Sequence, residues 1–80
     1  MTITHLKALA EQYKWDLMYE RGNTYLFRRN LQRFEVTCAD TRVGYAIDSN
    51  PQTVATMFHQ GTFLTTQDNL DQKILDLVTS

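Results

Sequence analysis

The chain has 80 residues, of which 42% are hydrophobic and 21% are charged, and its formal net charge is −1. This composition excludes a disordered chain, and the length leaves room for one small domain over residues 1–80. The near-neutral charge argues against a protein that binds nucleic acid through an overall cationic excess. The single cysteine excludes an intramolecular disulfide and a zinc site made of cysteines.

The hydropathy of the chain and its first residues indicate where in the cell the protein is expected. No apolar run approaches the roughly 20 residues that a membrane-spanning helix needs. The first residues, Met1 to His5, lack the basic region and continuous apolar stretch of a signal peptide. We therefore expect a cytoplasmic protein with no membrane partner.

The first predicted element is a helix over residues 3–14. Its apolar residues follow one stripe at helical spacing: Leu6, Leu9, Ala10 and Tyr13. Thr2 precedes this stripe, and its hydroxyl suits the N-cap because it accepts a hydrogen bond from an unpaired backbone N–H.

A strand is predicted over residues 15–20, where apolar and polar side chains alternate with a period of two. The inward face of this strand is expected to carry Trp15, Leu17 and Tyr19. Met18, together with Leu26 on the following strand, would then lie on the outer face, where apolar side chains suit a partner.

Further strands are predicted on both sides of short turns. Gly and Asn in residues 21–23 favour a hairpin turn, which leads into a second strand over residues 24–29. A third strand covers residues 34–39, with Phe34, Val36 and Cys38 on one face. Residues 40–41 would turn the chain, and residues 43–48 form either a fourth strand or an extension of the third.

A helix is predicted after residues 49–51, because Ser or Asn suits the cap and Pro suits the first helical position. Its buried stripe would consist of Val54, Met57 and Phe58. Gly61 fits the left-handed conformation that ends many helices.

The last predicted element is a helix over residues 67–78. Thr65 and Asp68 have the spacing of a capping box at its start. The buried face of this helix is expected to carry Leu70, Ile74, Leu77 and Val78.

Together, these elements predict an α+β fold. An antiparallel meander sheet of three or four strands would pack one face against the N-terminal helix and two C-terminal helices. The whole chain forms a single domain in this prediction.

Charge is unevenly distributed along the chain. Residues 21–42 carry five arginines against two acids, a net charge of +3, whereas residues 43–80 carry one lysine against four aspartates, a net charge of −3. Residues 1–20 contribute −1. The hairpin region is therefore cationic through arginine alone, and arginine makes planar contacts with carboxylates and phosphates that lysine cannot make.

The arginines of the hairpin region are mixed with aromatic residues, and this mixture has two interpretations. Charged residues on strand edges can simply prevent pairing with other chains. Alternatively, arginine and aromatic side chains together form a recognition surface. On the second interpretation, the candidate partner-binding residues are Arg28, Arg29, Arg33, Arg42, Tyr19 and Tyr25.

Catalytic and metal-binding patterns are missing from the sequence, so we expect a non-enzymatic protein without catalytic residues, cofactor or metal. His59 near a predicted helix end has a structural explanation, because a cationic side chain is favourable there. Cys38 lies beside Val36 in a predicted strand and is expected to be a small buried hydrophobic residue. Asp68 and Asp71 suit an exposed helix face.

The order of elements is similar to that of small proteins encoded by prophages and mobile elements, including a type II-A anti-CRISPR family that inhibits Cas9. Residues 1–6, residues 15–20 and the predicted helix after Asp48 fall in comparable places. The resemblance implies an anti-defence inhibitor. That family is markedly acidic and resembles DNA, whereas residues 21–42 here are basic, so no functional residue is transferred from it.

The sequence thus predicts a small non-enzymatic binding protein that inhibits or regulates a macromolecular partner, either a protein or a protein–nucleic-acid complex. One alternative is a nucleic-acid-binding accessory protein that uses the arginine-rich hairpin directly. Another is a homo-oligomeric module, such as a homodimer, in which the basic hairpin of one copy meets the acidic C-terminal region of another.

Overall fold

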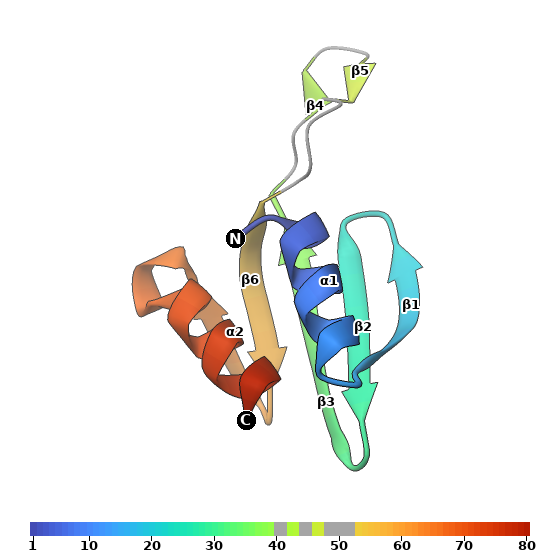
Figure 1. The fold of residues 1–80 in the computed structure, drawn as a ribbon. Coiled ribbons are helices and arrows are strands. Elements are labelled where there is room, and N and C mark those ends of the chain that lie inside the picture. The colour runs from blue at the N-terminus through green and yellow to red at the C-terminus, as the bar shows by residue number, and fades with distance from the viewer. Residues whose placement is uncertain (40–41, 44–45, 48–52) are drawn as a thin grey trace.

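The computed structural model describes residues 1–39, 42–43, 46–47 and 53–80. The fold is α+β: an antiparallel sheet of five strands, in the order β1-β2-β3-β6-β7, lies behind two helices (Figure 1). The helices are α1 (Ile3–Gln12) and α2 (Leu70–Thr79). The strands of this sheet are β1 (Asp16–Arg21), β2 (Thr24–Arg29), β3 (Gln32–Cys38), β6 (Val54–His59) and β7 (Thr62–Thr65).

A second, two-stranded sheet lies between β3 and β6 in the chain. It pairs β4 (Arg42–Val43) with β5 (Ala46–Ile47), and Figure 1 shows it beyond the ends of β3 and β6. The predicted turn at residues 40–41 lies outside the described residues. The predicted strand over residues 43–48 is wrong as a single element, because Val43 and Ala46 pair with each other in opposite directions.

The prediction of α1 is confirmed, with an end two residues earlier than expected. Thr2 is its N-cap, since the His5 backbone N–H donates to Thr2 Oγ1 over 3.2 Å. Lys14 has a φ of 70°, a left-handed conformation that an α-helix cannot continue. The Trp15 N–H then donates back to the Ala10 carbonyl oxygen over 2.9 Å, and the chain turns into β1.

Three two-residue turns join neighbouring strands of the large sheet. They contain Gly22, Asn30 and Gly61, with φ values of 57°, 55° and 81°. A positive φ in such a short turn matches the right-handed twist of the flanking strands. The sheet up to β3 is therefore a meander of tight hairpins, and β6 and β7 form another hairpin along its edge.

The predicted helix after residues 49–51 is wrong where the structure describes it, since β6 and β7 occupy residues 54–65. The pairing of β3 with β6 shifts beside Ala55, so the buried Val54 and Met57 are three residues apart although they lie on one strand. A spacing of three between buried residues is also typical of a helix, which explains the wrong prediction. Gly61 belongs to a hairpin turn, and the predicted helix start at residues 49–51 lies outside the described residues.

The C-terminal helix forms as predicted, but a short 3₁₀ turn, η1 (Thr66–Asp68), precedes it. The predicted capping box is confirmed on this turn. The Gln67 N–H donates to Thr65 Oγ1 and the Thr65 N–H donates to Asp68 Oδ2, each over 3.3 Å. Asn69 then adopts a φ of 58°, so the α-helix itself begins only at Leu70.

Both helices pack on the same face of the sheet. The buried side chains of the helices are Ile3, Leu6, Ala10, Leu70, Ile74 and Val78. The buried side chains of the sheet, and of the residue just before β1, are Trp15, Tyr25, Phe27, Phe34, Val36, Cys38, Val54 and Met57. Cys38 is buried as predicted, and burial raises the pKa of its thiol, which keeps it in the unreactive protonated form.

Aromatic side chains form the centre of this core. The Trp15 ring meets Phe34 edge-on at 4.9 Å between centroids, and Phe34 stacks with Phe27 at 5.0 Å. The Trp15 indole N–H also donates to the carbonyl oxygen of Val78 over 3.1 Å. Trp15 therefore joins the sheet to the C-terminal end of α2.

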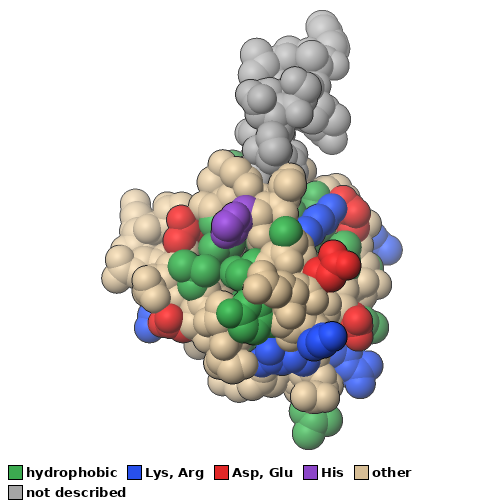
Figure 2. All heavy atoms as spheres, in the orientation of Figure 1, with side chains coloured by type: hydrophobic (Ala, Val, Ile, Leu, Met, Phe, Trp, Pro, Cys, Tyr) green, Lys and Arg blue, Asp and Glu red, His purple; other side chains and the backbone are tan. Residues whose placement is uncertain are grey.

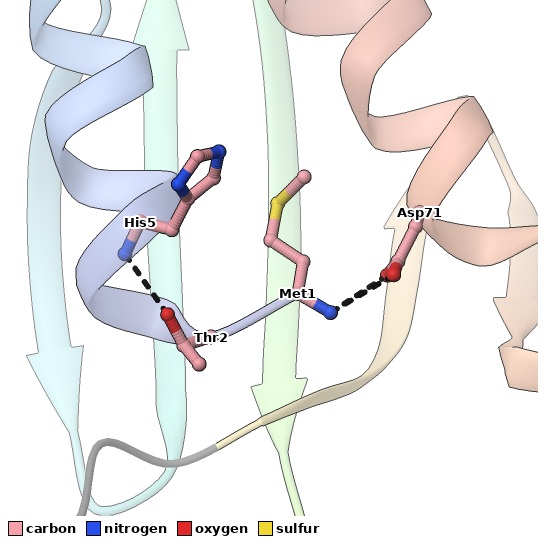
Figure 3. A network of polar contacts seen from close by, with 4 residues as sticks. All are labelled: Met1, Thr2, His5 and Asp71. Carbon is pink, nitrogen blue, oxygen red and sulfur yellow. Dashed lines mark hydrogen bonds and ion pairs between the residues drawn. The ribbon is translucent and has the colours of Figure 1, made fainter.

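The beginning of the chain is tied to α2 and β6. The Met1 ammonium group lies 2.9 Å from Asp71 Oδ2, as Figure 3 shows. The Met1 carbonyl oxygen accepts from the Val54 N–H over 2.8 Å. These contacts help to hold both helices against one face of the sheet. No helix among the described residues covers the opposite face.

Candidate binding face

The side of the sheet opposite the helices is called the open face here. Its members follow from strand pairing, because directly paired residues point to the same side and neighbours along a strand alternate. Glu35 pairs with both Leu26 and Phe58 and points away from the core. The open face therefore carries a central row across all five strands: Tyr19, Leu26, Glu35, Phe58 and Phe63.

A row of threonines lies on one side of the central row. It runs over four strands and consists of Thr24, Thr37, Thr56 and Thr65. The hydroxyl oxygens of Thr24 and Thr37 are 3.4 Å apart, as expected for a directly opposed pair. These hydroxyls give one margin of the open face a polar, uncharged character.

Arg28 and Arg33 lie on the other side of the central row, directly opposite each other on β2 and β3. Both side chains are exposed. Arg28 Nε donates to the Asn30 carbonyl oxygen over 3.3 Å, but neither guanidinium group forms an ion pair within the described part of the chain. Arg28 also lies directly opposite Asp16 on β1, so this row carries one acid and two arginines. Like charges in directly opposed positions destabilise a sheet, and a bound anion beside Arg28 and Arg33 would relieve their repulsion.

Tyr19 has the opposite orientation to the one that the sequence predicts. The pairing of β1 with β2 shifts between Leu17 and Tyr19, so that Met18 is the extra residue of a bulge. Leu17 pairs with Phe27 on the helix side, whereas Tyr19 pairs with Leu26 on the open face. The inward prediction for Tyr19 is therefore wrong, and the outward prediction for Leu26 is confirmed.

Tyr19 and Glu35 form a hydrogen bond over the open face. The Tyr19 hydroxyl donates to Glu35 Oε2 over 2.6 Å, which spans the intervening strand β2. This bond, and then the charge of the same carboxylate, raises the pKa of Tyr19, because the phenolate would lose the bond and be repelled. At neutral pH, Tyr19 is therefore a neutral phenol that donates to Glu35.

We expect Glu35→Gln to lower the pKa of Tyr19 toward its usual value, because the carboxylate is the main cause of the shift. Since the folded state raises this pKa, the Tyr19 contact supports the fold below the ordinary tyrosine pKa. That support is lost as the pH rises through the raised value. A ¹³Cζ NMR titration of the tyrosines, with Tyr19→Phe to assign the signal, measures the change. An unchanged titration in the Glu35→Gln protein would contradict the contact.

A shallow hollow of about 250 Å³ opens on this face beside the central row. It is lined by Leu26, Arg33, Phe34, Glu35, Phe58 and Gln60. An aromatic ring, a guanidinium group, a carboxylate and an amide thus surround one small space. Next to it, the exposed ring of Phe63 contacts Phe58 at 4.8 Å between centroids.

Tyr25 is not on this face. It is 5% exposed and belongs to the core on the helix side. Burial, with the nearby Glu20 carboxylate, raises the pKa of its phenol, and the Lys7 ammonium nitrogen lies 5.0 Å from its ring centroid. As a buried residue, Tyr25 is not available as the contact residue that the sequence suggests.

Arg29 also lies on the helix side, and its guanidinium group is occupied. It donates to the carbonyl oxygens of Tyr13 over 3.1 Å and Ser80 over 2.8 Å, and it lies 4.5 Å from the Trp15 ring centroid. The arginine therefore satisfies carbonyl groups after both helices, where cations are favourable. This position gives Arg29 a structural role in place of the predicted partner contact.

We expect Arg29→Met to lower the free energy of unfolding by about 1–2 kcal/mol, because the charge-assisted hydrogen bonds to carbonyl groups are lost. Methionine keeps an apolar stem that can cover Trp15. Urea unfolding of the variant and the wild type measures the difference. An unchanged midpoint would contradict the structural role of Arg29.

Arg42 lies in β4, where the structure describes the backbone and not the side chain. Of the predicted contact residues, the structure therefore brings together Arg28, Arg33 and Tyr19 on the open face. Three further residues of this face were missed as contacts: Glu35, Phe58 and Phe63. For the two phenylalanines, the sequence signal was Gly61 between them. A hairpin turn at Gly61 places Phe58 and Phe63 opposite each other on one face of the sheet.

Charges on the helix side are mixed. Figure 2 shows acidic and basic side chains scattered over that side. Asp71 binds the N-terminal ammonium group, and Lys7 Nζ lies 3.5 Å from Glu20 Oε1. Among the described residues, Arg28 and Arg33 on the open face lack an ion pair, and so do Lys14 and Lys73 outside it. The open face differs in that its two arginines lie directly opposite each other.

Over the described residues, no group of three His, Cys, Asp or Glu side chains could hold a metal ion, and no helix is long and apolar enough to cross a membrane. Comparison with known proteins adds no assignment: no family model, curated protein or solved structure matches this chain.

Proposed function

We propose that this chain is a small non-enzymatic binding protein that captures a macromolecular partner on its open face and so inhibits or regulates it. The observation that carries the proposal is the Arg28–Arg33 couple, which has no ion-pair partner among the described residues. It lies beside exposed aromatic rings on a sheet face that no described helix covers. Aromatic and arginine side chains are the residues that contribute most to binding in macromolecular interfaces. An anti-defence inhibitor is the specific form that the predicted order of elements suggests.

A face-to-face pair of copies is a poor alternative for the same surface. Glu35 lies on the third of five strands and in the middle row, so it is at the centre of the open face. A two-fold axis through that centre brings each residue there against its own copy. Two carboxylates would then meet, and this contact is unfavourable.

Contact between the basic and acidic regions of two copies is also disfavoured as a route to a dimer. Arg28 and Arg33 lie on the open face, whereas α2 with Asp71 and Asp76 lies on the helix side. A contact between opposite sides of the molecule is heterologous, so it continues into an open chain of copies. The geometry therefore favours a different macromolecule as the partner.

Affinity capture from a lysate of the source cells tests the proposal. We expect Phe58→Thr combined with Phe63→Thr to reduce capture at least about ten-fold, because exposed aromatic anchors are lost. Threonine suits a strand, so the fold is retained. The control is Leu31→Ser, which removes an apolar side chain that is 98% exposed but lies outside the central row.

Capture that is equal for all three proteins would contradict the proposal, as would capture that only the control loses. Circular dichroism of each variant ensures that the compared proteins are folded. Photo-crosslinking from position 63 supplies a second measurement, since a partner on the open face must lie within reach of that side chain.

A further inference from the structure

We infer that the occupant of the open face is single-stranded nucleic acid, with one base in the hollow on Phe58 and its flanking phosphates on Arg28 and Arg33. The inference rests on the proposed function and names the chemistry of the partner. Its first support is the arginine couple, because two adjacent guanidinium groups without an ion-pair partner among the described residues match a phosphate.

The second support is the chemistry of the hollow. The Phe58 ring offers a stacking surface, and base–aromatic stacking is the main source of binding for unpaired bases. Glu35 and Gln60 on its walls can form hydrogen bonds with base edges, as carboxylates and amides do in base recognition. A volume of about 250 Å³ is below that of most sites for drug-sized ligands and suits one flat group.

The third support is the spacing along β3. Arg33 and Glu35 are two residues apart, so their outward side chains are about 6.6 Å apart along the strand. One nucleotide, with a phosphate at one end and a base at the other, covers such a span. The arginines and the hollow can therefore engage the same nucleotide or two successive ones.

The hollow and the arginines together favour a single strand over other anionic partners. An acidic peptide offers carboxylates but no base to stack on Phe58, so it would leave the hollow unused. A duplex keeps its bases stacked, so it could use only phosphate contacts on this face, and two arginines supply few of them. A single strand instead combines few phosphate contacts with stacking, which matches two arginines beside aromatic rings.

Fluorescence anisotropy with labelled 20-nucleotide single-stranded DNA and RNA of mixed sequence tests the inference. We expect binding at low salt, with log Kd rising against log salt at a slope of about 1.4 for two phosphate contacts on a single strand. Phe58→Leu keeps an apolar side chain without the ring, and we expect it to weaken binding at least about five-fold. A duplex of equal length should bind more weakly than either strand.

Two results would overturn the inference. One is the absence of oligonucleotide binding at low salt, and the other is binding that Phe58→Leu leaves unchanged. If capture from nuclease-treated lysate still depends on Phe58 and Phe63 in that case, the proposed function stands and the occupant is a protein. If capture is also independent of these residues, both proposals fail.

Discussion

Trp15→Ala is expected to lower the free energy of unfolding by about 3–5 kcal/mol, the largest stability effect of any single change considered for this chain. The total for a chain of 80 residues is about 4–12 kcal/mol. The ring contacts Phe34, its N–H donates to the Val78 carbonyl oxygen, and Arg29 covers it. Its removal leaves a cavity where the sheet meets α2, and the Val78 carbonyl oxygen loses its bond from the indole N–H.

Thermal and urea unfolding measure this effect, and we expect the melting temperature to fall by more than about 12 °C. If Trp15→Ala does not fold, Trp15→Phe keeps a six-membered ring and removes the N–H donor together with the rest of the five-membered ring. We expect that variant to cost about 1–2 kcal/mol. Leu31→Ala serves as the control, because Leu31 is 98% exposed at a hairpin tip and its truncation should change stability by less than about 0.5 kcal/mol.

A loss below about 1 kcal/mol in Trp15→Ala would show that α2 is held to the sheet without this side chain. The remaining candidates would then be the buried α2 residues Ile74 and Val78, which face the sheet. The two variants of Trp15 thus compare the loss of the whole aromatic side chain with the loss of the hydrogen bond and the five-membered ring alone.

Much of this fold could be predicted from local pattern. The N-cap at Thr2, the strand over Thr24–Arg29 and the buried face of β3 all follow from periodicity and from residue preferences, and the structure agrees. In each case, neighbouring residues alone determine the element. The α+β class with helices on one side of an antiparallel sheet follows from the order of these elements.

The errors arise where strand pairing is irregular. Ala55 is an extra residue of β6 with no partner on β3, so Val54 and Met57 lie on the same face at a spacing of three, which is also the spacing of a helix. A similar shift at Met18 turns Tyr19 to the opposite face from Leu17. A bulge depends on the partner strand, so the alternation within one segment cannot reveal it.

These same irregularities determine the candidate binding face. The bulge in β1 brings Tyr19 close to Glu35. The β6–β7 hairpin exposes Phe58 and Phe63, whereas the predicted helix would have buried Phe58. Charge segregation predicted a cationic hairpin, but it could not separate Arg29, which points to the helix side, from Arg28 beside it. Adjacent residues of a strand point in opposite directions, so only the register assigns them.

Changing Arg28 and Arg33 together to glutamate is expected to weaken partner binding at least about 100-fold and to leave the fold stable. Charge reversal removes two contacts to an anionic partner and adds repulsion, and each charged contact of this kind contributes about 2 kcal/mol or more. The fold is retained at a small cost. One directly opposed like-charge pair replaces another between these two positions, and Arg28→Glu also places an acid opposite Asp16. Binding is measured by affinity capture and by oligonucleotide anisotropy, and stability by urea unfolding.

The matched control is Lys14→Glu with Lys73→Glu, which makes the same change in net charge on exposed residues outside the open face. Equal losses in the two double variants would show that overall charge, and not the open face, governs binding. The single change Arg33→Glu provides a further test. It places an acid opposite Arg28, so we expect a gain in stability of about 0.2–1 kcal/mol together with a loss of binding. If the Arg33→Glu protein is more stable but binds less well, the arginine at this position serves binding and not the stability of the fold.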